Sequence, residues 1–164
     1  MIIYISAYAH LFARRRRGLM KTYNYNDSIG RKIATCSRLI GNGLNKKFKD
    51  LNCPLTFEQW KIMTCLRPRE GISQNELAVI VDKDHTLVSK LVSSLIKRNM
   101  LLRIPDPNDK RTNRVFLTQE GKEILENLAT EQVQVFLDSI VEDIPEHEVE
   151  IFSSVLDRII KKIQ

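Results

Sequence analysis

Residues 73–118 read SQNELAVIVDKDHTLVSKLVSSLIKRNMLLRIPDPNDKRTNRVFLT, and this stretch decides the fold. It predicts two short helices and then two strands. The strands enclose a basic loop that is too polar to belong to a hydrophobic core. Ser73 and Glu76 form a capping box that starts the first helix. Polar residues 82–84 separate it from a second helix over residues 85–98. This order of elements is typical of a DNA-reading head.

The second helix has an apolar face and a polar face of unusual chemistry. At about 100° per residue, Leu87, Val88, Leu91, Val92 and Leu95 fall on one half of the helix. The other half carries Thr86, Ser89, Lys90, Ser93, Ser94 and Lys97. A merely solvated face usually alternates acids and lysines, but no acid follows Asp84 here. Hydroxyls and lysines suit a helix that lies in a major groove, although an ordinary amphipathic helix remains an alternative.

The two strands, residues 100–104 and 112–117, flank a loop that begins with Pro105-Asp106-Pro107. Prolines withhold amide donors, so the loop is expected to leave the ladder and project as a wing. Asp109 lies two residues before Arg111, and we expect it to orient that guanidinium. An arginine at the tip of a loop suits the narrow, negative minor groove. The alternative is a plain turn with a surface ion pair.

Positive charge is concentrated in this region. The net charge of +6 depends largely on residues 14–17, which are all arginine; without them 22 basic residues face 20 acidic ones. Between residues 82 and 114, however, eight Lys/Arg accompany four Asp/Glu, which favours DNA as the partner. The residues expected to bind DNA are Ser73, Gln74, Lys83, His85, Thr86, Ser89, Lys90, Ser93, Lys97, Arg103, Asp109, Lys110, Arg111 and Arg114.

Several motifs in order resemble the MarR family of bacterial transcriptional regulators. They are LTFEQW at residues 55–60, the helix pair, a wing with Asp106, Asp109 and Arg111, and VFLTQEG at residues 115–121. The resemblance covers roughly residues 28–164 and implies a homodimer whose heads are carried by helices from both ends of the chain. It places the recognition-helix contacts on His85, Thr86, Ser89 and Lys90, and the wing-tip arginine at Arg111, supported by Asp109. Asn99 departs from the glycine that many members carry there, but asparagine tolerates the left-handed conformation.

The flanking segments are predicted to be dimerisation helices. Apolar residues recur at helical spacing over residues 28–52 and 119–164, and Pro145 is expected in the first turn of a last helix. The expected dimer-interface residues are Ile29, Ile33, Leu39, Ile140, Phe152, Val155, Ile159 and Ile160. Ordinary packing within one chain is the alternative.

The predicted fold is a single mainly α domain, residues 28–164, with a small β-hairpin. It consists of a winged helix-turn-helix head over residues 55–118 between dimerisation helices. Two heads related by a two-fold axis fit a palindromic operator.

Residues 1–27 do not fit this pattern. An apolar run precedes the arginines at residues 14–17, the reverse of a signal peptide, and it is too short to span a bilayer. Three interpretations remain for this N-terminal extension: a mis-assigned start with translation beginning at Met20, a disordered basic arm that contacts phosphates, or a membrane-surface anchor. No stable membrane association and a cytoplasmic location are expected.

The sequence offers no sign of catalysis. It contains no glycine-rich phosphate loop, nucleophile elbow or metal-ligand spacing, so we expect no enzyme activity, cofactor or metal. Cys36 is expected to be a small buried residue on the first long helix, with redox sensing as the less favoured alternative. A small-molecule effector is implied by the resemblance, and repression released by a ligand or oxidant is the expected mode of action. The rival function is a winged-helix module that binds protein rather than DNA.

Overall fold

The computed structural model describes residues 24–109 and 111–164. The chain divides into a unit that ends at Leu39 and a unit formed by Ile40–Gln164, and the division falls inside the helix α2, Ile29–Asp50. In the first unit, a 3-10 turn (η1, Tyr25–Asp27) precedes α2. The Asn24 side chain caps this turn, and the Arg31 guanidinium lies 5.3 Å from the centre of the Tyr25 ring.

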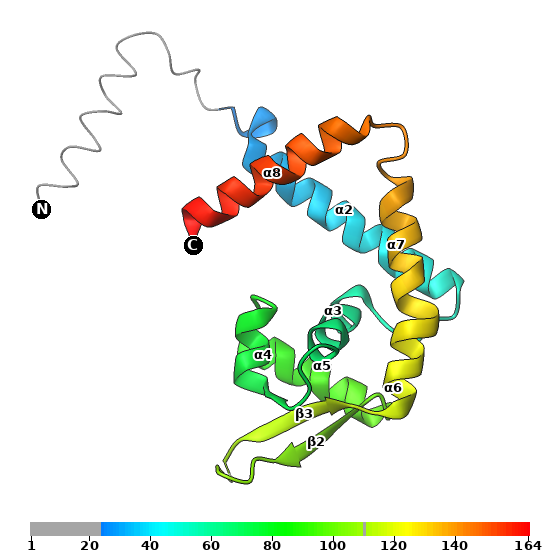
Figure 1. Cartoon of the computed structure of the whole chain (residues 1–164), viewed down its shortest axis with the longest axis vertical. Coiled ribbons are helices and arrows are strands. Elements are labelled where there is room, and N and C mark those ends of the chain that lie inside the picture. Colours follow the sequence, from blue (N-terminus) through cyan, green and yellow to red (C-terminus); the bar gives the residue numbers. More distant parts are fainter. Residues whose placement is uncertain (1–23, 110) are drawn as a thin grey trace, which may run out of the picture. The chain divides into compact units, whose positions relative to one another are not determined.

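The second unit contains the predicted head and the helices that follow it (Figure 1). After α2 come α3 (Phe57–Leu66), β1 (Ile72–Ser73), α4 (Gln74–Ile80), α5 (His85–Lys97), β2 (Leu101–Pro105) and β3 (Asn113–Leu117). Then follow α6 (Gln119–Ile124), the π-helical segment η2 (Leu125–Ala129), α7 (Thr130–Ser139) and α8 (Glu146–Ile163). Among the described residues, no helix is both long enough and apolar enough to cross a membrane.

The strands form a three-stranded antiparallel sheet in the order β1-β3-β2. Leu101 lies opposite Leu117 in the hairpin, and Ile72 of β1 lies opposite Val115. The mainly α winged-helix fold is therefore confirmed, with one strand more than the predicted hairpin. Two residues are too few for an alternating pattern, so β1 left no signal in the sequence. Pro105 ends β2, the edge strand, where its missing N–H costs no ladder bond.

The predicted helix boundaries are confirmed by their caps. The Thr56 hydroxyl accepts the Gln59 N–H and the Ser73 hydroxyl accepts the Glu76 N–H, each within a complete capping box. Asn99 adopts a φ of 57°, so asparagine serves in the left-handed position after α5. Pro145 differs slightly from expectation, because it precedes the first residue of α8 instead of lying in its first turn.

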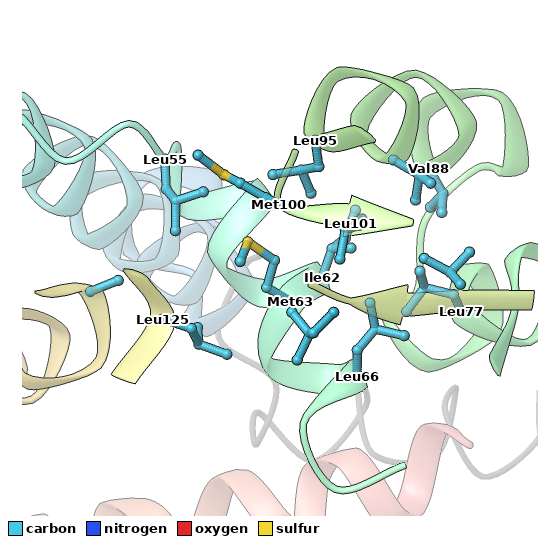
Figure 2. Packing of buried hydrophobic residues seen from close by; sticks show 14 of the residues in the cluster. Leu55, Ile62, Met63, Leu66, Leu77, Val88, Leu95, Met100, Leu101 and Leu125 are labelled. Carbon is cyan, nitrogen blue, oxygen red and sulfur yellow. The ribbon is translucent and has the colours of Figure 1, made fainter. Parts of the chain in front are cut away.

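Side chains from all elements of the head meet in one core (Figure 2). Ile62, Met63 and Leu66 of α3 point toward residues of α4, α5 and β2. The largest fully buried side chains are Phe48, Leu44, Ile62, Met63, Leu66, Leu77, Leu95, Leu101, Leu125, Val88, Val92 and Val115. Gly121 is required at the start of α6, because any Cβ there would overlap the Met100 carbonyl oxygen. The core thus fixes α5 and the hairpin on one scaffold.

The helical run after the wing is continuous but not regular. The sequence predicts one long helix after Thr118, whereas the structure places the π-helical segment η2 between α6 and α7. The Leu125 carbonyl oxygen accepts both the Thr130 backbone N–H, across the wider turn, and the Thr130 hydroxyl at 2.7 Å. The apolar spacing does not reveal a single inserted residue of this kind.

Candidate nucleic-acid interface

The α5 helix, the predicted recognition helix, is anchored at its start by Asp84. One Asp84 carboxylate oxygen accepts the backbone N–H of Leu87 at 3.2 Å and that of Thr86 at 2.8 Å. These hydrogen bonds lower the pKa of Asp84, so the cap is charged at neutral pH. Val88 and Val92 are buried beneath the helix, which fixes the direction of the opposite face.

That opposite face is accessible, as the sequence predicts. His85, Thr86, Lys90 and Lys97 are exposed, and the hydroxyl residues Ser89 and Ser93 are half-buried. A shallow depression of about 480 Å³ follows the face and is lined by Ser89, Lys90, Ser93, Ser94, Lys97 and Arg98. The assignment of Leu87 to the apolar face is wrong in part, because 41% of this residue remains exposed. Leu87 lies at the border of the apolar face, beside the fully buried Val88.

A hydrogen-bond network that the sequence did not reveal holds the C-terminal end of α5. The Arg98 guanidinium donates to the Pro54 carbonyl oxygen and, at 2.9 Å, to Gln59 Oε1. Gln59, only 6% exposed, also donates from Nε2 to the Ser94 hydroxyl. Buried amide groups of this kind rigidify an element when they are fully satisfied. Ser94 on the polar face of α5 and Arg98, which follows the helix, thus have structural roles.

The role expected for Asp109 in the wing is wrong. No ion pair joins Asp109 to the Arg111 guanidinium in the described residues; Asp109 instead accepts the Arg111 backbone N–H at 2.9 Å and the Thr112 hydroxyl at 2.8 Å. An aspartate that bonds the backbone two residues later forms an Asx-turn. Asp109 therefore sets the path of the loop that carries Arg111, and the exposed Arg111 side chain is not held by it.

Asp106 and Arg114 form the internal support of the wing. The Asp106 carboxylate, on a residue only 7% exposed, accepts Arg114 Nε at 2.5 Å and the Asn108 backbone N–H at 2.8 Å. The Asn108 bond first and the Arg114 guanidinium second lower the pKa of Asp106. Arg114 also donates to the Gly71 carbonyl oxygen at 2.9 Å. Arg114 was expected to meet phosphates, but in the free protein its guanidinium is engaged in these contacts.

The remaining predicted contact residues lie around α4, α5 and the wing. Arg103 is exposed on β2. Lys83 lies 3.7 Å from the Glu58 carboxylate, on the side of the head formed by α3. The Ser73 hydroxyl is occupied by its cap, whereas Gln74 lies beside Arg111 and His85. Lys110 is outside the described residues. The structure thus brings Gln74, His85 and Arg111 together from three separate segments.

Comparisons with known proteins agree with this architecture. A model of the MarR family matches residues 55–112, from α3 to the wing. The HTH-type transcriptional regulator YybA of Bacillus subtilis is 27% identical over 84% of this chain and 90% of that protein. The multiple antibiotic resistance protein MarR of Salmonella typhimurium is 26% identical over 82% and 90%. The chain is thus similar to regulators of the MarR family, and the family model covers the segment from α3 to the wing.

Solved structures share the fold. The crystal structure of a mutant of Escherichia coli MarR superposes with a TM-score of 0.70 at 25% identity, covering 84% of this chain and 99% of that one. A mutant MarR from the same organism, complexed with operator DNA, gives a TM-score of 0.75 at 24% identity, covering 85% and 99%. The relatives that this chain matches are transcriptional regulators and not enzymes.

The expected dimer-interface residues are accessible in the single chain. Large exposed fractions are found on α2 for Ile29 (59%) and Leu39 (55%), and on α8 for Phe152 (55%) and Ile160 (47%). Ile140 and Val155 are also exposed, whereas Ile33 and Ile159 are half-buried. Apolar stripes of this extent on a protein surface mark interaction sites.

The cysteines differ in accessibility. Cys36 was expected to be buried, yet its side chain on α2 is exposed. Burial raises the pKa of the Cys53 and Cys65 thiols above the ordinary value, so both remain protonated at neutral pH. Among the residues that the structure describes, no three His, Cys, Asp or Glu side chains gather as metal ligands.

Proposed function

We propose that this protein is a sequence-specific, double-stranded DNA-binding transcriptional regulator that acts as a homodimer on a palindromic operator. The observation that carries the proposal is the accessible hydroxyl and lysine face of α5 beside the exposed Arg111 of the wing. Both features are directed to solvent, and both belong to elements whose other faces are fixed by the core.

In the proposed complex, each head occupies two neighbouring grooves. The residues Thr86, Ser89, Lys90 and Ser93 enter the major groove, where hydroxyls and ammonium groups meet base edges and phosphates. The Arg111 side chain enters the adjacent minor groove, whose negative potential favours a guanidinium. Because Asp109 fixes the backbone and leaves the guanidinium free, all the donors of Arg111 remain available for DNA.

Two such heads are joined through the accessible apolar stripes of α2 and α8. Self-association covers these stripes and presents two identical recognition helices related by a two-fold axis. The operator is then a palindrome with half-site centres separated by one helical turn, ~10 bp.

Replacement of Arg111 tests the proposal. We expect Arg111→Ala to weaken binding to the duplex upstream of the protein's own gene by about 1–3 kcal/mol, because a guanidinium in the groove is lost. Gel shift or fluorescence anisotropy measures the change. Lys46→Ala, which removes one exposed positive charge from α2, is the control and should have little effect.

An unchanged affinity of Arg111→Ala would favour the rival function, a winged-helix module that binds protein. Such a module has no requirement for an arginine on a projecting loop. The accessible hydroxyl and lysine face of α5 favours DNA over this rival, because apolar anchors usually dominate protein interfaces.

We further propose that the protein represses transcription and that a small ligand or an oxidant releases it from DNA. Release requires different affinities of the effector for the bound and free arrangements of the heads. For an oxidant, the accessible Cys36 thiol is the sensor. Peroxide should then release DNA from the wild type but not from Cys36→Ser in a gel shift, and equal release from both would exclude this cysteine.

A further inference from the structure

Three segments of the head meet in a small notch of about 230 Å³ between the helix pair and the wing. The start of α4, the first residue of α5 and the base of the wing all line it. Six of its lining residues are Gln74, Asn75, His85, Arg111, Thr112 and Asn113. We refer to this site as the wing notch.

Gln74 lines the wing notch and carries an unused donor. Its Nε2 atom is buried and has no hydrogen-bond partner within residues 24–109 and 111–164. Buried polar groups are nearly always hydrogen-bonded, because an unpaired donor loses the water it had in the unfolded chain. The free protein therefore contains an unsatisfied donor beside the notch, which a movement of the Gln74 side chain can offer to an acceptor from outside.

The charges around the notch indicate what kind of acceptor it is. The nearby carboxylates are all committed to other donors: Glu76 to the Ser73 backbone N–H, Asp109 to Arg111 and Thr112, and Asp106 to Arg114. None of these three carboxylates lines the notch, whereas Arg111 does. A site whose described lining has amide donors, a guanidinium and no carboxylate favours an anion that only accepts hydrogen bonds.

The position of the notch identifies the anion. The notch lies between the first residue of α5 and the wing, the two elements proposed to enter neighbouring grooves. One sugar–phosphate strand separates a major groove from the adjacent minor groove. We propose that the wing notch binds a phosphate diester of this strand and that Gln74 Nε2 donates to one of its non-bridging oxygens, an inference that rests on the proposed DNA binding.

The contact gives Gln74 a role that differs from that of the basic residues. A phosphate contact is independent of base sequence, so it fixes the register of the head on any duplex. Gln74 carries no charge and displaces no counterion, whereas Arg111 does. Loss of Gln74 should therefore lower the affinity equally at every salt concentration.

The experiment compares full-length wild type with Gln74→Ala, Gln74→Glu and Arg111→Ala on a short synthetic duplex of arbitrary sequence. Gln74→Glu keeps the side-chain shape but replaces the donor by a negative acceptor. Gln119→Glu, an exposed residue at the start of α6 outside the notch, makes the same change of charge and is the matched control. Circular dichroism melting verifies that each variant is folded.

We expect Gln74→Ala to bind about tenfold more weakly, with an unchanged slope of log affinity against log KCl concentration. Gln74→Glu should bind more weakly still, and Gln119→Glu should bind like the wild type. Arg111→Ala should reduce the slope by about one. In a set of duplexes, a single neutral methylphosphonate replaces the phosphate at one position after another. At one of these positions the replacement should weaken binding of the wild type but cause no further loss for Gln74→Ala.

Two results would overturn the assignment while leaving the proposed function intact. One is wild-type affinity in both Gln74 variants when Arg111→Ala is weakened. The other is a methylphosphonate scan in which the wild type and Gln74→Ala lose the same affinity at every position, because Gln74 would then contact no phosphate. If the wild type binds no duplex at all, the proposed function and this inference both fail.

Discussion

At the scale of single residues, three acidic side chains have structural roles that their positions in the sequence only partly reveal. Asp84 caps the recognition helix, Asp109 turns the wing and Asp106 binds Arg114. Each carboxylate accepts at least one backbone N–H group, which helps to fix the segment that follows it. Among the neighbouring basic side chains, Arg114 is held directly by its acid, whereas Arg111 is placed only through its backbone.

Asp106 makes the stability of the head depend on pH. Its pKa is lowered in the folded protein, so the carboxylate stabilises the fold at any pH above the ordinary carboxyl value of about 4. This contribution is lost as the pH falls through the lowered value. We expect Asp106→Asn to decrease the urea midpoint at pH 7 and to show a smaller further decrease upon acidification than the wild type. Parallel urea titrations at pH 7 and at acidic pH measure this.

The control for this prediction is Asp138→Asn on α7, an exposed carboxylate that should leave the midpoint at pH 7 almost unchanged. Asp84 and Glu76 also have lowered pKa values, so some acid sensitivity will remain in Asp106→Asn. Identical acid sensitivity in the variant and the wild type would show that the Asp106–Arg114 pair does not support the wing.

At the scale of elements, the sequence predicted what depends on local spacing and missed what depends on distant partners. The caps at Ser73, Thr56 and Asn99 are local, and all are confirmed. The bonds from Arg98 to Pro54 and Gln59 join residues about 40 positions apart, and no periodicity reveals them. Asp109 shows the limit clearly, since its spacing to Arg111 fits a guanidinium contact and an Asx-turn equally well.

The wing supplies a prediction that separates these two roles of Asp109. Asparagine retains the side-chain oxygen that accepts the Arg111 backbone N–H but lacks the negative charge. We therefore expect Asp109→Asn to retain DNA affinity within about threefold, whereas Asp109→Ala should lose about 1 kcal/mol because the loop is no longer fixed. Fluorescence anisotropy on the same duplex compares the two variants.

Equal defects in the two variants would instead support the expectation from the sequence, that Asp109 orients the Arg111 guanidinium. If Asp109 acted through its charge, Asp109→Asn would lose as much DNA affinity as Asp109→Ala. Arg111→Ala provides the reference, since each Asp109 variant should have no further effect in that background.

At the scale of the whole molecule, the fold is only partly accounted for by one chain. The core lies within the head and the segments next to it, whereas α8 contains no buried residue over its entire length from Glu146 to Ile163. An 18-residue helix with an apolar stripe and nothing buried requires a partner, because its exposed stripe would otherwise stay in water. The sequence predicted the stripe and favoured a second copy over packing within the same chain. The exposed Phe152 and Ile160 favour a second copy.

Phe152→Asp tests whether a second copy covers α8. A charge placed in an apolar interface loses its water without gaining a partner, so self-association should weaken at least 100-fold, or about 3 kcal/mol. Analytical ultracentrifugation should then change from twice the chain mass of 19.0 kDa to the single mass. Val79→Asp provides the control, because Val79 is 81% exposed on α4, outside the proposed interface, and its variant should remain a dimer. Because a monomer has one head and makes half of the contacts with DNA, Phe152→Asp should also lose operator affinity. A monomer that binds the operator with full affinity would contradict the proposed two-fold assembly.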